Sequence, residues 1–416
     1  MTVVEFFDKN AIENMLGALC CQPDRIIFVG HNRKQMEKHL VNYRDVIQRR
    51  GVNVELLPPR VMNRNNLPQI VASLSKIVEE FGDCDFNLDG GEELYLVAVG
   101  MVAQKYPGKV RLHRFNIRNN SITDCDADGE DHLMAPIVLD IRENISIYGG
   151  EVVDVTQHSD GTYPWNFTET FRRDVEKLWK VCCDQRAHWN GCINTLAWAI
   201  KVMPQEDPRV FLCRRSVVEP EMEREHDRYR MKLSVLRALE EEKLISWLRA
   251  EGDEVEFVFK SEQVKMALSK AGQVLELMAT MAAMDALEAD GTPVYNDVRC
   301  GVYIDWDGDV EPEGDVDVSN EVDVMMMKGA VPVFVSCKNG NMDPNELYKL
   351  ETVAQRFGGK YARKVLIAPM VDDLGEKGDY IRARAADMDI RVVYNFDHMT
   401  YEEMKREMKC LWLNSK

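Results

Sequence analysis

Residues 319–340 read SNEVDVMMMKGAVPVFVSCKNG, which predicts two strands joined by a tight turn at the Lys-Gly pair in the middle of the stretch. Side chains two positions apart lie on the same face of a strand. Glu321 and Asp323 therefore share a face of the first strand, and Ser336 and Lys338 share a face of the second. When these polar faces meet, two carboxylates, a hydroxyl and a lysine converge at the open end of the hairpin.

This combination of side chains suits metal chemistry on phosphates. Carboxylates at this spacing can hold Mg²⁺ or Mn²⁺, which take oxygen ligands. A lysine beside such a cation can orient water and stabilise negative charge on a phosphate. The same residues also make an ordinary solvated hairpin, because short acidic strands with a lysine are common on protein surfaces. The residues alone leave both interpretations open.

The composition is that of a globular protein with two or three domains, since the chain has 416 residues, of which 29% are charged and 45% hydrophobic. A net charge of −18 argues against a broad basic surface that coats nucleic acid. It does not exclude a nuclease whose metal ions contact the phosphate locally. Eleven cysteines without a C-x-x-C pair fit neither a disulfide framework nor a zinc site. With no signal segment and no apolar run near the roughly 18 residues of a membrane span, we expect a cytoplasmic protein that contacts no membrane.

The first 150 residues alternate predicted strands and helices. Apolar runs predict strands at residues 25–30, 52–57, 85–88 and 109–115, with amphipathic helices between them. This alternation predicts a doubly wound parallel sheet. Ligands of such sheets bind beyond the carboxyl ends of the strands, where the first turns of helices face an anion.

Two of these strand ends, which read GHN and NLDGGE, are rich in glycine and polar residues. The candidate ligand-binding residues there are Gly30, His31, Asn32, Asn87, Asp89, Gly90, Gly91 and Glu92. Glycine lets a phosphate approach the backbone closely. No G-x-G-x-x-G is present, so a dinucleotide fingerprint is unsupported. Each segment taken singly would also serve as a plain tight turn.

The middle of the chain has a different character. Residues 151–165 have the Gly, Pro and Ser content of a linker, and residues 167–202 are helical by pattern. A predicted helix at residues 227–242 and a predicted hairpin at 244–259 give the outline of a winged helix. Because the wing is acidic and would repel DNA, a spacer or dimerisation role is favoured over promoter binding.

Segments at both ends of the chain resemble one protein family. VEFFDKNAIENMLGAL, IIFVGHN and NLDGGEEL resemble CARF domains, the cyclic-oligoadenylate sensors of type III CRISPR systems, in the subgroup fused to a nuclease. The hairpin resembles the PD-(D/E)XK nuclease core, in which an Asp ends one strand and a carboxylate-x-Lys triplet lies on the next. Asp323 matches the Asp and Lys338 the Lys, but the triplet reads Ser336-Cys337-Lys338, so a serine stands where the family has an acid.

The resemblance also implies how a metal ion would be held. In the resembled family a Glu on the first helix of the nuclease domain is a metal ligand. Glu276, on an otherwise apolar predicted helix at residues 271–283, matches it and would supply the acid that Ser336 lacks. The implied ligands of Mn²⁺ or Mg²⁺ are Glu276, Asp323 and the carbonyl of Cys337.

Further residues have implied supporting roles. Glu321 would be an outer or alternate ligand, Ser336 would orient the attacking water by a hydrogen bond, and Lys338 would activate it. The helix after the lysine strand commonly lends a polar residue to such sites. Glu351 and Gln355, one turn apart on one face of that helix, are the secondary candidates.

The implied architecture is α/β throughout, in three parts. A Rossmann-like CARF ligand-sensing domain would occupy residues 1–150, a linker with a helical, winged-helix-like segment 151–264, and a PD-(D/E)XK restriction-endonuclease-like domain 265–416. The implied protein is a homodimer activated by cyclic tetra-adenylate. It would cleave single-stranded DNA, RNA or both, and nick duplex DNA, in antiviral defence.

Two other functions stay open at this point. The chain would be a ligand-responsive DNA-binding regulator if its nuclease fold were inactive. It would be a ring nuclease if its first domain degraded the cyclic oligoadenylate that it binds.

Overall fold

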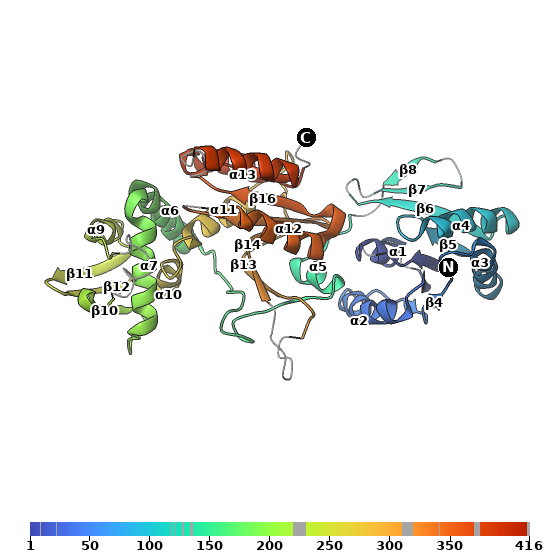
Figure 1. Ribbon diagram of the computed structural model, residues 1–416, viewed down its shortest axis with the longest axis horizontal. Coiled ribbons are helices and arrows are strands. Elements are labelled where there is room, and N and C mark those ends of the chain that lie inside the picture. Colours follow the sequence, from blue (N-terminus) through green and yellow to red (C-terminus); the bar gives the residue numbers. More distant parts are fainter. Residues whose placement is uncertain are drawn as a thin grey trace.

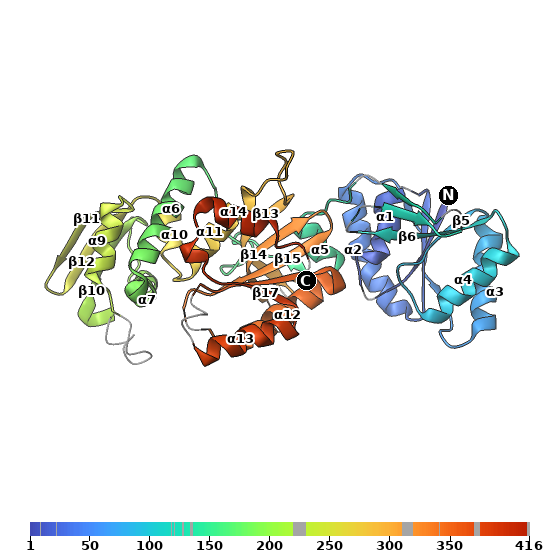
Figure 2. The ribbon, with the colours of Figure 1, turned by 90° about the horizontal axis from the view of Figure 1, so that it is seen from above.

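The computed structural model describes residues 1–413 except positions 9, 22, 118, 120, 127–128, 134–135, 219–229, 310–318, 341 and 370–374. Its three β-sheets follow one another along the long axis of the molecule (Figure 1). The sheet formed mostly by the last part of the chain lies between the other two, and the view from above agrees (Figure 2). The spatial order of the sheets therefore differs from their order in the sequence.

The first sheet has the strand order β3-β2-β1-β5-β6-β7-β8, with β4 also paired to β2. Its strands are β1 (Thr2–Phe6), β2 (Arg25–Gly30), β3 (Glu55–Leu56), β4 (Arg60–Val61), β5 (Cys84–Asn87), β6 (Val110–Asn116), β7 (Ser121–Asp124) and β8 (Asp131–Leu133). The strands from β3 to β6 are parallel, which confirms the predicted parallel sheet, and β7 and β8 extend it antiparallel. The strand predicted at 52–57 is shorter than expected because only two residues of β2 pair with it.

The central strands β1, β2 and β5 of this sheet are buried on both faces. Its helices are η1 (Glu13–Met15), α1 (Leu16–Cys21), α2 (Arg33–Arg49), α3 (Leu67–Phe81) and α4 (Glu93–Lys105). Because successive side chains of a strand point to opposite faces, Val3 and Ile26 pack in one apolar core while Val4 and Ile27 pack in another. The first of these cores continues into the third sheet through α5 (Ile141–Ile147), so the two sheets share apolar packing.

The second sheet is small, antiparallel and ordered β10-β12-β11. Its strands are β10 (Val210–Arg214), β11 (Ile245–Glu251) and β12 (Glu254–Phe259), and its helices are α6 (Glu169–Asp184), α7 (Arg186–Val202), α9 (Leu233–Glu241) and α10 (Glu262–Ala267). The hairpin predicted at 244–259 is confirmed. The helix predicted at 227–242 begins at Leu233, and positions 227–229 lie outside the described residues.

The third sheet has the order β17-β16-β15-β14-β13-β9, antiparallel from β9 to β15 and parallel from β15 to β17. Its strands are β9 (Glu151–Val152), β13 (Asp297–Asp305), β14 (Ser319–Lys328), β15 (Val331–Cys337), β16 (Arg363–Ile367) and β17 (Ile390–Val393). Its helices are α11 (Gln273–Met284), α12 (Asn345–Gly358), η2 (Gly359–Tyr361), α13 (Glu376–Asp387), η4 (Phe396–His398) and α14 (Tyr401–Lys409).

The predicted hairpin is β14–β15. Lys328 pairs with Val331, so the turn lies at Gly329-Ala330, one residue later than predicted, and Gly329 adopts a φ of +62° that favours glycine. Between the turn and the open end, at residues 324–327 and 331–335, the strands are apolar on both faces and buried in the sheet. Polar side chains are therefore confined to the open end of the hairpin, where they can face one site.

Two broader features concern the chain as a whole. Among the helices of the described residues, none is long and apolar enough to cross a membrane.

The domain boundaries near residues 150 and 265 stay predictions. Helix α5, just before residue 150, contacts β13, β14 and α12 of the third sheet.

Candidate functional site

Asp323 and Lys338 meet at the open end of the β14–β15 hairpin. The Nζ of Lys338 lies 3.3 Å from Oδ2 of Asp323. The same oxygen accepts hydrogen bonds from the backbone N–H of Cys337, at 2.7 Å, and from Oγ of Ser336, at 3.2 Å. Three donors on one oxygen hold the carboxylate in place, while Oδ1 faces Lys270 at 4.0 Å.

Glu276 reaches the same place from α11, which confirms the helix predicted at residues 271–283. It is 1% exposed on a helix that is otherwise almost entirely apolar. A buried carboxylate requires hydrogen bonds or a counter-charge. Gln273 supplies the first, donating from Nε2 to Oε2 of Glu276 at 2.9 Å, and Lys270 supplies the second at 3.1 Å from Oε1.

Three carboxylates gather at this point. Glu276, Glu321 and Asp323 each place one oxygen within 4.8 Å of the others. The ammonium of Lys270 lies among them, 2.6 Å from Glu321 and 3.1 Å from Glu276. We call these three acids the acidic cluster. Lys270, in the turn before α11, was not a sequence candidate, and no motif marks it.

The donor set fits a divalent cation. Three carboxylate groups facing one point match the oxygen ligands that Mg²⁺ and Mn²⁺ prefer. Their mutual repulsion requires a positive charge at that point, and the Lys270 ammonium supplies one. The backbone of Cys337, predicted as a carbonyl ligand, lies beside the cluster because its N–H is bound to Asp323.

Burial and neighbouring charge shift the ionisation of these groups. Burial raises the pKa of Glu276 to about 8, and the Asp323 carboxylate adds to the rise while Lys270 opposes it. Burial alone would lower the pKa of Lys338, but the carboxylates of Asp323 and Glu346 outweigh it and raise that pKa above its ordinary value. Lys338 is therefore an ammonium at neutral pH and acts as a charged hydrogen-bond donor.

Helix α12 contributes a different residue from those predicted. Glu346, in its first turn, lies 3.2 Å from Nζ of Lys338. Glu351 pairs instead with Lys364, at 2.5 Å, and Gln355 is exposed; in the described chain no hydrogen bond or ion pair joins either one to Lys338. Gln355 lies nine residues beyond Glu346, which is about 14 Å along the helix axis. The start of the helix, next to the lysine strand, is the part that reaches the cluster.

The two predicted sensor segments also come together, at the carboxyl ends of β2 and β5. Nδ1 of His31 lies 3.3 Å from a carboxylate oxygen of Glu92. Asn32 caps α2 by accepting a hydrogen bond from the backbone N–H of Gln35, at 3.1 Å. Parallel strands place these distant segments side by side because their carboxyl ends meet at one edge of the sheet.

Other residues of the sensor segments hold the turns together. Asn87 is buried and donates to Glu5 at 2.8 Å, so it is an internal support. Gly90 and Gly91 pass close to β1 and the loop after it: a Cβ on Gly90 would lie 2.8 Å from Cβ of Asp8, and one on Gly91 would lie 2.6 Å from Cβ of Phe6. Glycine is needed at both positions for the close packing of the turn.

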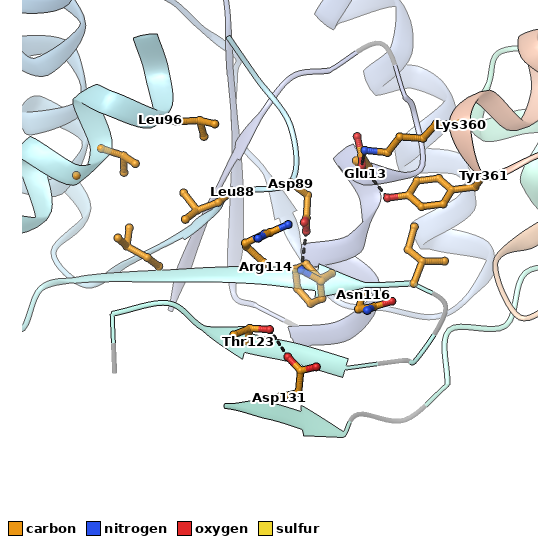
Figure 3. A pocket seen from close by; sticks show the side chains of 15 residues that line it. Glu13, Leu88, Asp89, Leu96, Arg114, Asn116, Thr123, Asp131, Lys360 and Tyr361 are labelled. Atoms are coloured by element: carbon orange, nitrogen blue, oxygen red, sulfur yellow. Dashed lines mark hydrogen bonds and ion pairs between the residues drawn. The ribbon is translucent and has the colours of Figure 1, made fainter. Parts of the chain in front are cut away.

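A cavity of about 970 Å³ lies next to the carboxyl end of β5 and to β6 (Figure 3). Asp89 lines it, and burial raises the pKa of this carboxyl to about 6. Across from Asp89, the carboxylate of Glu13 accepts a hydrogen bond from the hydroxyl of Tyr361, at 2.8 Å, and pairs with Lys360. Arg114 also lines the cavity. Of the predicted sensor residues, only Asp89 faces it; the other lining residues carry no glycine motif that would have marked them.

Comparison with known proteins bears on the fold. No protein-family model matches the chain, and no curated protein matches it in sequence. Protein VC1899 from Vibrio cholerae has a similar structure, with a TM-score of 0.70 over 98% of this chain and 97% of its own, at 16% identity. Can2 from Sulfobacillus thermosulfidooxidans, in a structure with cyclic tetra-adenylate, gives a TM-score of 0.66 over 98% and 99% of the two chains, also at 16% identity. At this level of identity the likeness shows a shared mixed α/β fold over the whole chain.

Proposed function

We propose that the chain is a metal-dependent nuclease of the CARF and PD-(D/E)XK type, activated by cyclic tetra-adenylate. The observation that carries this proposal is the convergence of Glu276, Glu321 and Asp323 with Lys338 at one point. Two further observations support it: the sensor segments meet at the ligand-binding edge of a parallel sheet, and the fold is similar to that of Can2, which was solved with cyclic tetra-adenylate.

The acids would form the metal site. Glu276, Asp323 and the carbonyl of Cys337 would hold Mn²⁺ or Mg²⁺, with Glu321 as an outer or alternate ligand. The cation would supply Lewis acidity at the scissile phosphate and lower the pKa of a bound water. The inactive-nuclease alternative is disfavoured, because an inactive site has no need of three carboxylates and a partly buried lysine in one place.

The remaining polar residues would position the reaction. Lys338 is charged and would donate hydrogen bonds to the attacking water and to the oxygens of the phosphate. Glu346 and Asp323 hold this ammonium from two sides, at 3.2 and 3.3 Å. Ser336 donates to Asp323 and so steadies a carboxylate without adding a further negative charge.

The sensor would work as a homodimer. An apolar face of α4 is exposed at Leu96, Val97 and Met101, and Val97 is 52% exposed. Since Glu92 is the N-cap residue directly before this helix, a second copy on that face would bring two sets of strand ends side by side. A cyclic tetra-adenylate is itself nearly two-fold symmetric and would bind across such a pair.

The experiment is cleavage of single-stranded DNA and RNA with Mn²⁺, across a panel of cyclic oligoadenylates. Cleavage should require both the metal and cyclic tetra-adenylate. Lys338→Ala should lower the rate at least about 100-fold, since the charged donor is lost from the transition state.

The matched control is Lys349→Ala, because Lys349 pairs with the same Glu346, at 2.6 Å, from the exposed side of α12. It should leave the rate unchanged. Equal cleavage by Lys338→Ala and the wild type would overturn the proposed mechanism.

A further inference from the structure

A small cavity of about 210 Å³ opens beside the acidic cluster. Glu321 and Lys270 form one side of it. Three aromatic residues, Tyr163, Trp165 and Tyr303, line it as well. Glu321 and Lys270 thus belong both to the candidate metal site and to the lining of an aromatic cavity.

The aromatic side is built by the segment predicted as a linker. After β9, this segment runs along the edge of the third sheet: the N–H of Val153 donates to the carbonyl of Tyr303 at 2.9 Å, and the N–H of Tyr303 donates to Oγ1 of Thr162 at 2.8 Å. These bonds on both sides of Tyr303 fasten residues 153–162 to β13. Tyr163 and Trp165 follow directly and are placed against the catalytic end of the sheet.

The aromatic rings support one another. The Tyr163 and Trp165 rings are 5.0 Å apart, edge to face, and the Trp165 indole stacks on Phe171 at 5.7 Å with planes 3° apart. Phe171 belongs to α6 and is buried in the apolar core. Phe171 therefore fixes the Trp165 indole by packing against one of its faces. This lowers the conformational-entropy cost of stacking a further ring on this surface.

The other side of the cavity can contact phosphate and sugar. Tyr303 lies opposite Glu321 in the β13–β14 pairing, and both line the cavity; Lys270 supplies a positive charge. Gln273 also lines the cavity while it donates to Glu276. A nucleotide whose phosphate lies at the acidic cluster would therefore have its base next to the aromatic residues.

We propose that this cavity takes one base of a single-stranded nucleic acid, from the nucleotide next to the scissile phosphate; this rests on the proposed nuclease function. Every base offers a flat face to an aromatic ring, so the cavity would select strandedness more than sequence. In a duplex each base is stacked and paired, and must be pulled out before it can enter such a pocket. The cavity thus predicts a preference for single strands over duplex DNA.

The test combines a protein change with a substrate change. Labelled single strands carrying one abasic position, moved stepwise past the cleaved bond, are compared for wild type, Trp165→Ala and Tyr163→Ala in the presence of Mn²⁺ and cyclic tetra-adenylate. One abasic position should raise KM of the wild type about tenfold. The same position should have no effect on Trp165→Ala, because the stacking partner is already lost.

Two further variants separate stacking from structure. Trp165→Phe keeps an aromatic ring and should recover most of the wild-type KM. Trp247→Ala removes a tryptophan that is 77% exposed on the distant second sheet and should match the wild type. Tyr163→Ala gives an independent result if Trp165→Ala fails to fold, because Tyr163 is not among the residues that pack against the apolar core.

Binding of the same oligonucleotides in EDTA, followed by fluorescence anisotropy, gives a readout without cleavage. If the wild type binds these oligonucleotides but does not cleave them with Mn²⁺, the nuclease proposal fails. The effect of the abasic position on binding then still shows whether the cavity takes a base. If the wild type cleaves and every abasic position affects wild type and Trp165→Ala equally, this inference alone is overturned.

Discussion

Lys270 is the residue that most changes the interpretation of the candidate active site. Its ammonium contacts two acids of the cluster closely and lies 4.0 Å from the third. Burial works against its charged form, but Glu276, Glu321 and Asp323 together raise its pKa above the ordinary value. A divalent cation that enters the cluster must therefore compete with a lysine that already neutralises it.

Replacing this lysine should strengthen metal binding. In Lys270→Gln the cation no longer has to displace an ammonium, so Mn²⁺ should bind about tenfold more tightly, which is about 1.4 kcal/mol. The metal-free protein should melt at a lower temperature, because Glu276 and Glu321 lose the ammonium that neutralises them. Calorimetric titration with Mn²⁺ and thermal unfolding measure the two effects without nucleic acid. Lys349→Gln, an exposed lysine on α12, is the control, and weaker Mn²⁺ binding by Lys270→Gln would show that the lysine assists the metal.

Ser336 illustrates how a single departure from the family pattern is accommodated. The third carboxylate does not come from its strand position, because Glu276 and Glu321 reach the cluster from α11 and β14. The Ser336 hydroxyl then serves as a donor to Asp323. A fourth acid at this position would add repulsion to a cluster that already requires a cation.

Among the elements, β1 is tied to its neighbours by one buried carboxyl. Glu5 accepts hydrogen bonds from the backbone N–H of Gly17 on α1, at 3.0 Å, and from Asn87 on β5, at 2.8 Å. Complete burial raises the pKa of Glu5 to about 8, although both hydrogen bonds favour the ionised form. This group ties β1 to α1 and to β5, whose end carries one of the two sensor segments.

Its titration predicts a pH-dependent stability of the sensor sheet. The ordinary pKa of Glu5 is 4.5 and the folded value is about 8, so in that window the folded chain holds a proton that the unfolded chain has released. The contribution of Glu5 to the free energy of unfolding is fully present below pH 4.5. It is lost as the pH rises toward 8, by up to about 1.4 kcal/mol per pH unit. Glu5→Gln cannot titrate, so its melting temperature should rise relative to wild type between pH 5.5 and 8.

The control for this change is Glu80→Gln, a half-exposed carboxyl on α3 that pairs with Arg60. Its melting temperature should run parallel to that of the wild type with pH. A parallel profile for Glu5→Gln as well would mean that Glu5 is ionised in the folded protein.

Helix α12 and the turn after it reach two sites. Glu346, in its first turn, holds Lys338 at the acidic cluster. Lys360 and Tyr361, in η2 directly after the helix, contact Glu13 at the 970 Å³ cavity of the first sheet. One continuous stretch of about four helical turns therefore contacts both the candidate active site and the candidate sensor.

For the whole molecule, the third sheet lies at the centre and the apolar core runs from the first sheet into it through α5. The sensor and the candidate active site are thus parts of one packed body. The exposed apolar face of α4 points away from this shared core, as expected of a surface that would meet a second copy.

A charge on that face should break the dimer. Met101→Glu would bury an unpaired carboxylate at the interface, so the protein should sediment as a monomer and bind cyclic tetra-adenylate at least about tenfold more weakly. Analytical ultracentrifugation and ligand titration measure both. Val41→Glu changes an apolar residue of α2 that is also exposed, and it should leave both unchanged. A wild-type monomer with full ligand affinity would contradict the proposed dimer.

Much of the local structure follows from the sequence alone. Alternation with a period of two predicts the β14–β15 hairpin and places Glu321 and Asp323 on the face that meets Lys338. The alternation of apolar strands and amphipathic helices predicts the parallel part of the first sheet. These features depend on backbone geometry and on neighbours within a few residues, so the order of side chains determines them. Glu276 is different, because its assignment came only from the family resemblance.

Tertiary packing decided the rest. Lys270 and Tyr361 occupy sites that no local pattern marks, because each reaches a partner that is distant in the sequence: Glu321 is 51 residues from Lys270, and Glu13 is 348 residues from Tyr361. The segment predicted as a linker lines the aromatic side of the 210 Å³ cavity, because the pairing of β9 with β13 holds its start at the edge of the third sheet. Contacts of this kind depend on which apolar faces of the helices and sheets pack together. That packing is a property of the whole folded chain.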